Sequence, residues 1–164
     1  MSDKLYFQWH ITDACNFRCR HCYQDNFTKD SELGLDALIK IYNNITSSAG
    51  DKKIVINLTG GEPFLKADFF ELLTYLDRQE KTEELAIITN GSLINEGLLR
   101  KLGAVRKLRQ IKVSLDGATE RTNDSIRRPG SFRAVVENIN LLQEKTDFEV
   151  IIMLTVMRSI GYEL

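Results

Sequence analysis

The stretch Cys15-Asn16-Phe17-Arg18-Cys19-Arg20-His21-Cys22 contains the only three cysteines of the 164-residue chain. They are separated by three residues and then by two, and they follow a segment in which apolar and polar residues alternate. Three thiolates this close in sequence can converge on one metal centre. Protein iron–sulfur clusters are normally held by four cysteines, so three would leave one iron of a four-iron cluster with an open coordination position. The stretch therefore predicts a metal centre at which chemistry can take place.

Structural zinc is the alternative interpretation of the same stretch. Cys15, Cys19 and Cys22 would make a Cys3His site together with His10 or His21. Zinc motifs usually carry a second pair of ligands farther along the chain, and this sequence has no other cysteine or histidine. An iron–sulfur cluster is therefore favoured over zinc.

The composition limits the function classes. The chain is 43% hydrophobic and 27% charged, with a net charge of −1, and its length predicts one domain over residues 1–164. Near-neutral charge gives no electrostatic reason to expect a nucleic-acid or membrane partner, and no apolar run reaches the length of a membrane span. The N-terminus does not read as a signal peptide, and three clustered cysteines are no disulfide framework. We therefore expect a cytoplasmic protein.

Alternation of strands and helices predicts an α/β fold with parallel strands. The periodicity predicts strands at 4–12, 52–59, 85–89, 110–115 and 148–157. It predicts helices at 31–46, 67–79 with Asp68 as its cap, 94–102 and 131–145, the last preceded by a long loop that contains Arg127-Arg128-Pro129-Gly130.

The faces of these strands favour a barrel over a doubly wound sheet. A doubly wound sheet is covered by helices on both sides and reads as apolar on both. Here one face is polar, and it carries Gln8, His10, Asn57, Thr59, Lys112, Ser114 and Asp116. We therefore predict an incomplete (β/α) barrel of about five βα units with a polar bore, whose functional residues follow the strands.

Distinctive motifs follow the first four predicted strands and should meet at one mouth of the barrel. After the cysteine loop they are Gly60-Gly61-Glu62-Pro63, Thr89-Asn90-Gly91 and Ser114-Leu115-Asp116-Gly117. Each has a structural interpretation, because Gly-Pro and Asn-Gly sequences are common in tight turns and loop arginines are commonly solvated. The functional interpretation is that the glycines let the backbone approach a ligand, while Glu62 or neighbouring carbonyls bind its ammonium group.

The cysteine spacing together with Gly60-Gly61-Glu62-Pro63 resembles the signature of the radical SAM superfamily, and the resemblance extends from Trp9 to about Met157. It implies that Cys15, Cys19 and Cys22 bind a 4Fe–4S cluster whose fourth iron is chelated by S-adenosylmethionine (SAM), with His21 in the usually aromatic position. It further implies an arginine, Arg127 or Arg128, at the SAM carboxylate. The residues expected to contact the cofactor are His21, Gly60, Gly61, Glu62, Pro63, Asn90, Ser114, Asp116, Arg127 and Arg128.

The resemblance also implies a reaction. A flavodoxin- or ferredoxin-type donor would reduce the cluster, and reductive cleavage of SAM would give a 5′-deoxyadenosyl radical that removes hydrogen from a peptide or small-molecule substrate. The series T-G-G-E-P, T-N-G, S-x-D-G and R-x-x-G-S-F looks most like the SPASM or twitch branch, which often modifies peptides.

Other interpretations remain open at this point. One is an enzyme of cofactor biosynthesis, such as that of haem-type tetrapyrroles. Another is a non-catalytic module with structural zinc or an iron–sulfur cluster, and a third is a domain that binds SAM without cleaving it. The sequence departs from the family pattern because it ends after five predicted strands and has no further cysteines. We therefore expect a fragment of a longer enzyme, or a core that needs a partner.

Overall fold

The computed structural model describes residues 3–30 and 32–157. It contains one sheet of five parallel strands, in the order β1-β2-β3-β4-β5. The strands are β1 (Lys4–His10), β2 (Lys53–Thr59), β3 (Thr82–Thr89), β4 (Leu108–Ser114) and β5 (Glu149–Met153). The helices are α1 (Leu35–Ser48), α2 (Phe69–Arg78), α3 (Glu96–Leu102), α4 (Glu120–Ile126) and α5 (Ser131–Lys145), with a 3₁₀ turn, η1 (Pro63–Leu65), before α2.

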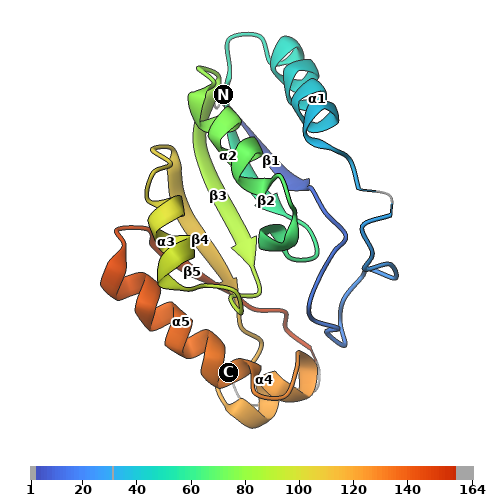
Figure 1. The fold of residues 1–164 in the computed structure, drawn as a ribbon, viewed down its shortest axis with the longest axis vertical. Coiled ribbons are helices and arrows are strands. Elements are labelled where there is room, and N and C mark those ends of the chain that lie inside the picture. Colours follow the sequence, from blue (N-terminus) through green and yellow to red (C-terminus); the bar gives the residue numbers. More distant parts are fainter. Residues whose placement is uncertain (1–2, 31, 158–164) are drawn as a thin grey trace.

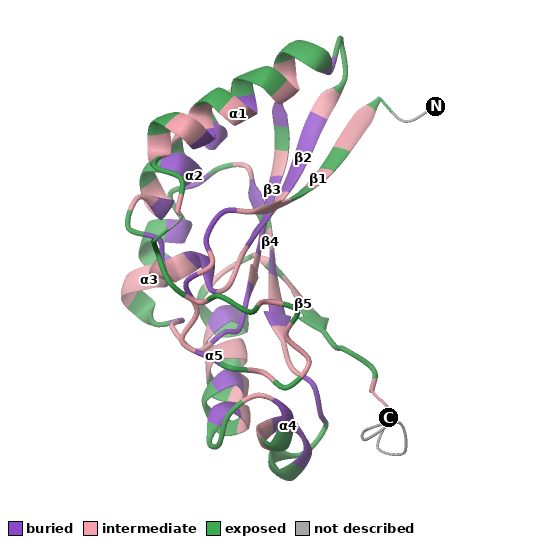
Figure 2. Ribbon diagram, turned by 90° about the vertical axis from the view of Figure 1, so that its right-hand side faces the viewer, coloured by how far each residue is buried: buried purple, intermediate pink, exposed green. Residues whose placement is uncertain are grey.

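The strand order confirms the predicted partial barrel. A doubly wound sheet reverses its strand order at a switch point, whereas here the chain advances across the sheet one strand at a time (Figure 1). Right-handed crossovers in such an order place their helices on the same face. Figure 2 shows α1, α2, α3 and α5 on one side of the sheet. The other face is left for the bore.

The core lies between the sheet and these helices. Ile54, Ile56 and Leu58 of β2 are at most 2% exposed and pack with Leu72 and Leu76 of α2 in one apolar cluster. Burial of each such side chain contributes about 1.5–3 kcal/mol. Within the described ranges, no helix combines the length and apolarity needed to cross a membrane.

The polar bore is also present. Asn57 of β2 and Lys112 of β4 lie on the face opposite the helices, and the Lys112 ammonium donates a hydrogen bond to the Asn57 side-chain oxygen at 3.0 Å. Strands β2 and β4 are separated by β3 in the sheet. The bond therefore spans the bore side of a strand that lies between them.

The start of the first predicted helix was wrong. Ser31 lies outside the described residues, and α1 begins at Leu35 and continues to Ser48. Glu32 accepts a hydrogen bond from the Thr12 hydroxyl and lies 3.6 Å from the Lys66 ammonium, which also donates to the Leu33 carbonyl at 2.8 Å. These tertiary contacts hold the segment before Leu35 away from a helical path.

Four other expectations also differ from the structure. Strand β3 starts at Thr82, whose hydroxyl lies 2.9 Å from the buried Tyr42 hydroxyl. Strand β5 ends at Met153, because the following Thr155 N–H bonds to Asp116. The loop expected before residue 131 contains the short helix α4. Asp68 occupies the N-cap position of α2 without a capping hydrogen bond.

Candidate cofactor site

A cavity of about 380 Å³ lies where the chain leaves the carboxyl ends of the strands. All three cysteines line it, which places the predicted ligands around one space. Of the ten other predicted contacts, six line the same cavity: His21, Gly60, Gly61, Asn90, Ser114 and Arg127. Glu62, Pro63, Asp116 and Arg128 do not line it.

Gly60 and Gly61 bring the cysteine loop against the end of β2. The Gly61 N–H donates to the Thr12 carbonyl and the Glu62 N–H to the Ala14 carbonyl, both at 2.7 Å. A Cβ on Gly60 would lie 2.4 Å from the Thr12 carbonyl oxygen, and one on Gly61 would lie 2.3 Å from that of Ala14. The close backbone approach predicted for these glycines is therefore made to the protein's own chain, while both residues still border the cavity.

Glu62 is fully buried, so its carboxylate serves as an internal acceptor. Oε1 accepts from the Thr89 hydroxyl at 2.8 Å, and Oε2 accepts from the Asn90 N–H at 2.8 Å. Burial raises the pKa of Glu62 from 4.5 to about 7, against the opposing effect of these hydrogen bonds. Of the two groups predicted to bind an ammonium, the carboxylate points into the protein, and the neighbouring backbone borders the cavity.

Asp116 is a buried junction between three segments. Its Oδ2 lies 2.6 Å from His21 Nε2 and forms an ion pair at 2.7 Å with Arg127 Nε. Its Oδ1 accepts from the Thr155 N–H at 2.8 Å. Burial alone would raise the pKa of Asp116, but these hydrogen bonds and the Arg127 charge hold it below its usual range. The carboxylate thus joins the cysteine loop to the residues that follow α4 and β5.

The two candidate arginines have different positions relative to the cavity. Arg127 borders the cavity with a side chain that is only 7% exposed, and its Nη1 lies 3.9 Å from Cys19 Sγ. Arg128 is exposed, and its guanidinium lies over the Phe17 ring, 5.6 Å from the centroid. Only Arg127 is in a position to act inside the cavity.

Hydrogen-bond donors face two of the thiols. The Phe17 N–H donates to Cys15 Sγ at 3.4 Å, and the Asn90 side-chain amide lies 4.0 Å from the same sulfur. Burial raises the pKa of the Cys15 and Cys19 thiols, while these donors and Arg127 act in the opposite direction. Metal ligation requires thiolates, and N–H groups directed at sulfur stabilise them. The surroundings of the cavity therefore fit an iron–sulfur cluster.

The two histidines proposed as a fourth zinc ligand already have partners. His10 contacts the Tyr23 hydroxyl at 3.0 Å and Asp13 at 2.8 Å through its two ring nitrogens, and His21 contacts Asp116. In the part of the chain that the structure describes, no three histidine, cysteine or acidic side chains form a group that could hold a single metal ion.

Sequence reasoning missed several residues that build the site. Asn16 connects Asn90 and Ser92 through hydrogen bonds of 2.8 and 2.9 Å, which tie the cysteine loop to the end of β3. Asn123 is fully buried and accepts from the Asp116 N–H at 3.0 Å. Sequence spacing could not reveal these contacts, because 76 residues separate Asn16 from Ser92 and 7 separate Asp116 from Asn123. The one signal in the sequence was the position of Asn16 inside the cysteine motif.

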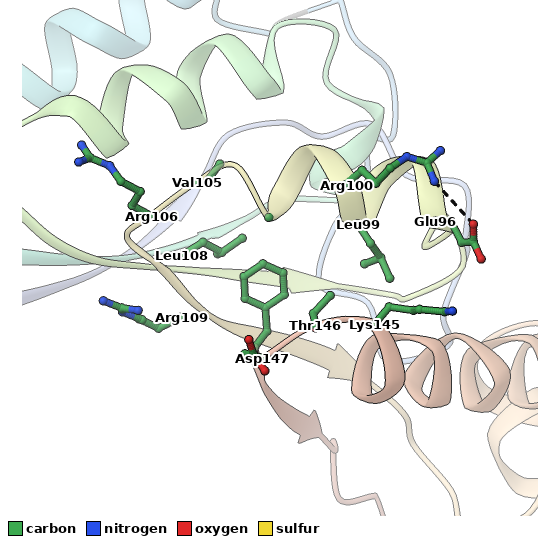
Figure 3. A pocket seen from close by; sticks show the side chains of 12 residues that line it. Glu96, Leu99, Arg100, Val105, Arg106, Leu108, Arg109, Lys145, Thr146 and Asp147 are labelled. Carbon is green, nitrogen blue, oxygen red and sulfur yellow. Dashed lines mark ion pairs between the residues drawn. The ribbon is translucent and has the colours of Figure 1, made fainter.

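A second cavity, of about 560 Å³, lies at the opposite end of the strands (Figure 3). Its lining comes from α3, from the residues before and at the start of β4, and from the end of α5 with the segment that leads to β5. The lining combines apolar side chains such as Leu99 and Phe148 with charged ones such as Arg109 and Lys145. None of the predicted site residues borders it.

The sequence of this chain is similar to those of several known proteins. An AdoMet-dependent heme synthase of Methanosarcina barkeri is 31% identical over 153 residues, which are 92% of this chain and 42% of that protein. The mycofactocin maturase MftC of Mycobacterium ulcerans is 32% identical over 135 residues, or 82% of this chain and 35% of the maturase. The chain thus spans less than half the length of either relative.

Solved structures agree with the predicted fold, and a family model agrees with the predicted family. The structure of native anSMEcpe with bound AdoMet and Cp18Cys peptide matches 91% of this chain and 42% of its own, with a TM-score of 0.70 and 22% identity. The model of the radical SAM superfamily matches residues 9–163. The predicted family is confirmed, and the chain belongs to the radical SAM superfamily.

Proposed function

We propose that this chain is the catalytic core of a radical SAM enzyme in which Cys15, Cys19 and Cys22 hold a 4Fe–4S cluster beside bound SAM. The observation that supports it is the convergence of all three thiols, Gly60 and Gly61 on one cavity. When bound, the cluster and SAM would supply a 5′-deoxyadenosyl radical after one-electron reduction. These cofactors supply the radical chemistry, so the role of the protein is to bind and orient them.

Different residues of the chain have different roles in binding and orienting the cofactors. The cysteines bind iron, and donors from Phe17 and Asn90 stabilise the Cys15 thiolate. The Ser114 side chain comes from the polar face of β4 and borders the cavity, where it can contact the methionine part of SAM. Glu62 acts indirectly, since its buried carboxylate holds the β2 and β3 loops together around the cavity.

For the whole protein we propose peptide modification, with an electron donor of the flavodoxin or ferredoxin type in the cytoplasm. Similarity to a mycofactocin maturase and to anSMEcpe, whose structure contains a bound peptide, supports this substrate class. Cofactor biosynthesis is the second candidate, because a heme synthase is matched at similar identity over 92% of this chain.

Anaerobic reconstitution with iron and sulfide tests the cofactor assignment. We expect about four irons and four sulfides per chain, SAM binding, and 5′-deoxyadenosine after reduction with dithionite. Replacing any one of Cys15, Cys19 or Cys22 by Ala should abolish both the cluster and the product, while Ser47→Ala, on the exposed side of α1, should change neither. Zinc without sulfide would contradict the proposal, and SAM binding without 5′-deoxyadenosine would show a binding domain.

The neighbouring genes offer a test of substrate class. A gene for a short precursor peptide would favour peptide modification, and genes for tetrapyrrole synthesis would favour the second candidate. The full-length enzyme should then transfer deuterium from the correct labelled substrate into 5′-deoxyadenosine, which mass spectrometry detects. No transfer from the encoded peptide would exclude it as the substrate.

A further inference from the structure

Two of the three thiols that line the cavity, those of Cys15 and Cys19, have different electrostatic surroundings. Cys15 Sγ receives neutral donors, the Phe17 N–H and the Asn90 amide. Cys19 Sγ instead lies 3.9 Å from Nη1 of Arg127. An arginine stays protonated throughout the accessible pH range. Cys19 is therefore next to a permanent positive charge.

Arg127 is held in this position by a buried carboxylate. Its Nε lies 2.7 Å from Asp116 Oδ2, and the two side chains are 7% and 0% exposed. Asp116 is itself fixed by His21 at 2.6 Å and by the Thr155 N–H at 2.8 Å. The guanidinium lies between the two groups: its Nε forms an ion pair with the Asp116 carboxylate at 2.7 Å, and its Nη1 donates to Cys19 Sγ at 3.9 Å.

A fixed positive donor at a cysteine sulfur affects cluster reduction. Reduction adds one negative charge to the cluster, and hydrogen bonds to the sulfurs and local charge set the potential at which this happens. Charge interactions are stronger where the groups are shielded from water, as Arg127 is here. The arginine should therefore stabilise the reduced state more than the oxidised state.

We propose that Arg127 raises the reduction potential of the cluster through Cys19, and that Asp116 is the positioning residue that orients it. This inference rests on the proposed function, because it requires the 4Fe–4S cluster. The role differs from the SAM-carboxylate contact that the family resemblance implies. The reason is that Nε of Arg127 is paired with Asp116 and Nη1 contacts Cys19, both of which are groups of the protein. The one electron involved comes from the external donor, and no bond is formed or broken.

Redox titration of the reconstituted cluster without SAM, followed by electron paramagnetic resonance, tests the proposal. At the wild-type midpoint potential, Arg127→Gln should lower the ratio of reduced to oxidised cluster about tenfold, which equals 59 mV for a one-electron couple. Arg121→Gln is the matched control: it removes the same charge from an exposed position of α4 and should leave the ratio unchanged.

Affinity for SAM separates this role from the alternative one. We expect Arg127→Gln to change the potential while the SAM dissociation constant stays within about threefold of wild type. An unchanged reduction potential in Arg127→Gln would overturn the inference. If SAM binding were lost at the same time, the arginine would be identified as a clamp on the SAM carboxylate. Wild-type protein that loads no cluster, or gives no 5′-deoxyadenosine with dithionite, would instead refute the proposed function itself.

A measurement on wild-type protein covers the case in which Arg127→Gln fails to load. With ¹⁵N introduced only at the guanidinium nitrogens of arginine, electron–nuclear double resonance of the reduced cluster should show a weak ¹⁵N coupling. Arg127→Lys, which retains the charge, should lose this signal, and Arg121→Gln should retain it. A wild-type cluster without any ¹⁵N coupling would overturn the inference.

Discussion

At the scale of single residues, Glu62 gives the stability of the fold a defined pH dependence. Its pKa is raised from 4.5 to about 7 by burial, so between these values the folded state binds more protons than the unfolded state. Stability from this group is fully present below about pH 4.5 and is lost as the pH rises through about 7, with a maximum slope of about 1.4 kcal/mol per pH unit. Urea unfolding of the apoprotein at a series of pH values, with the thiols reduced, measures this slope.

Glu62→Gln is the matched variant for that prediction. The amide can accept from the Asn90 N–H and donate to the Thr89 hydroxyl, so it replaces both short hydrogen bonds without an ionisable group. We expect its unfolding free energy to be flat over pH 5–7. Asp116 and Asp124 titrate below their usual 3.8 and act in acid with the opposite sign, so they do not interfere. A slope that persists in the variant would refute the assignment to Glu62.

The motif carboxylates also show the limit of residue-level prediction. The sequence identified Glu62 and Asp116 as site residues from their place after strands, and the structure puts both beside the cavity wall, facing inward. Whether a carboxylate faces a ligand or the protein depends on partners such as Thr89 and Thr155, which lie 27 and 39 residues away. Local sequence carries no signal for such pairs.

At the scale of elements, the attachment of the cysteine loop to β2 rests on Gly61. A Cβ there would lie 2.3 Å from the Ala14 carbonyl oxygen, so Gly61→Ala must displace the loop. We expect it to destabilise the protein by about 1–3 kcal/mol, as overpacking does, and to increase the rate at which Cys15 reacts with a thiol reagent. Unfolding curves and mass spectrometry of labelled peptides measure the two effects.

Gly34→Ala provides the control for that substitution. Nothing lies within 4 Å of its added Cβ, and the backbone φ of −72° suits alanine. Because Gly34 is the N-cap of α1 and alanine is a poorer N-cap residue, this variant should lose less than about 1 kcal/mol, with unchanged labelling. Equal behaviour of the two variants would show that the loop does not depend on the Gly61 contact.

Element boundaries were predictable where local pattern dominates. Alternation identified β2 nearly residue for residue, and apolar spacing identified α5 over 131–145. The start of α1 was not predictable, because the Lys66 ammonium holds the segment before it through Glu32 and the Leu33 carbonyl. Helix α4 was missed because its seven residues, Glu120–Ile126, carry no apolar stripe.

At the scale of the whole molecule, the described sheet has two edge strands, β1 and β5, each paired on one side only. Side chains on and after β5 are apolar and exposed, with Ile152 at 47% and Val156 at 68%. Exposed apolar edge strands promote pairing between chains. We expect the 164-residue chain to self-associate at raised concentration, and Ile152→Lys to reduce the weight-average mass in light scattering.

Thr74→Lys, on the exposed side of α2, is the control that adds the same charge away from the edge. It should leave the mass distribution as in wild type. If both lysine variants dissociate equally, net charge and not the β5 edge governs association. If neither does, association uses another surface.

The cysteine loop is held by residues from widely separated parts of the sequence, and this has a consequence for biosynthesis. The ribosome makes the three thiols before the residues that hold their loop, because the loop is attached to Gly61, Asn90 and the Ile126 carbonyl, which come later in the chain. The nascent polypeptide therefore emerges with its sulfur ligands before the supports that arrange them exist. For the proposed 4Fe–4S cluster, delivery of iron and sulfide by an assembly factor should accordingly wait until translation has passed Ile126, which leaves an interval in which the bare thiols are open to oxidation.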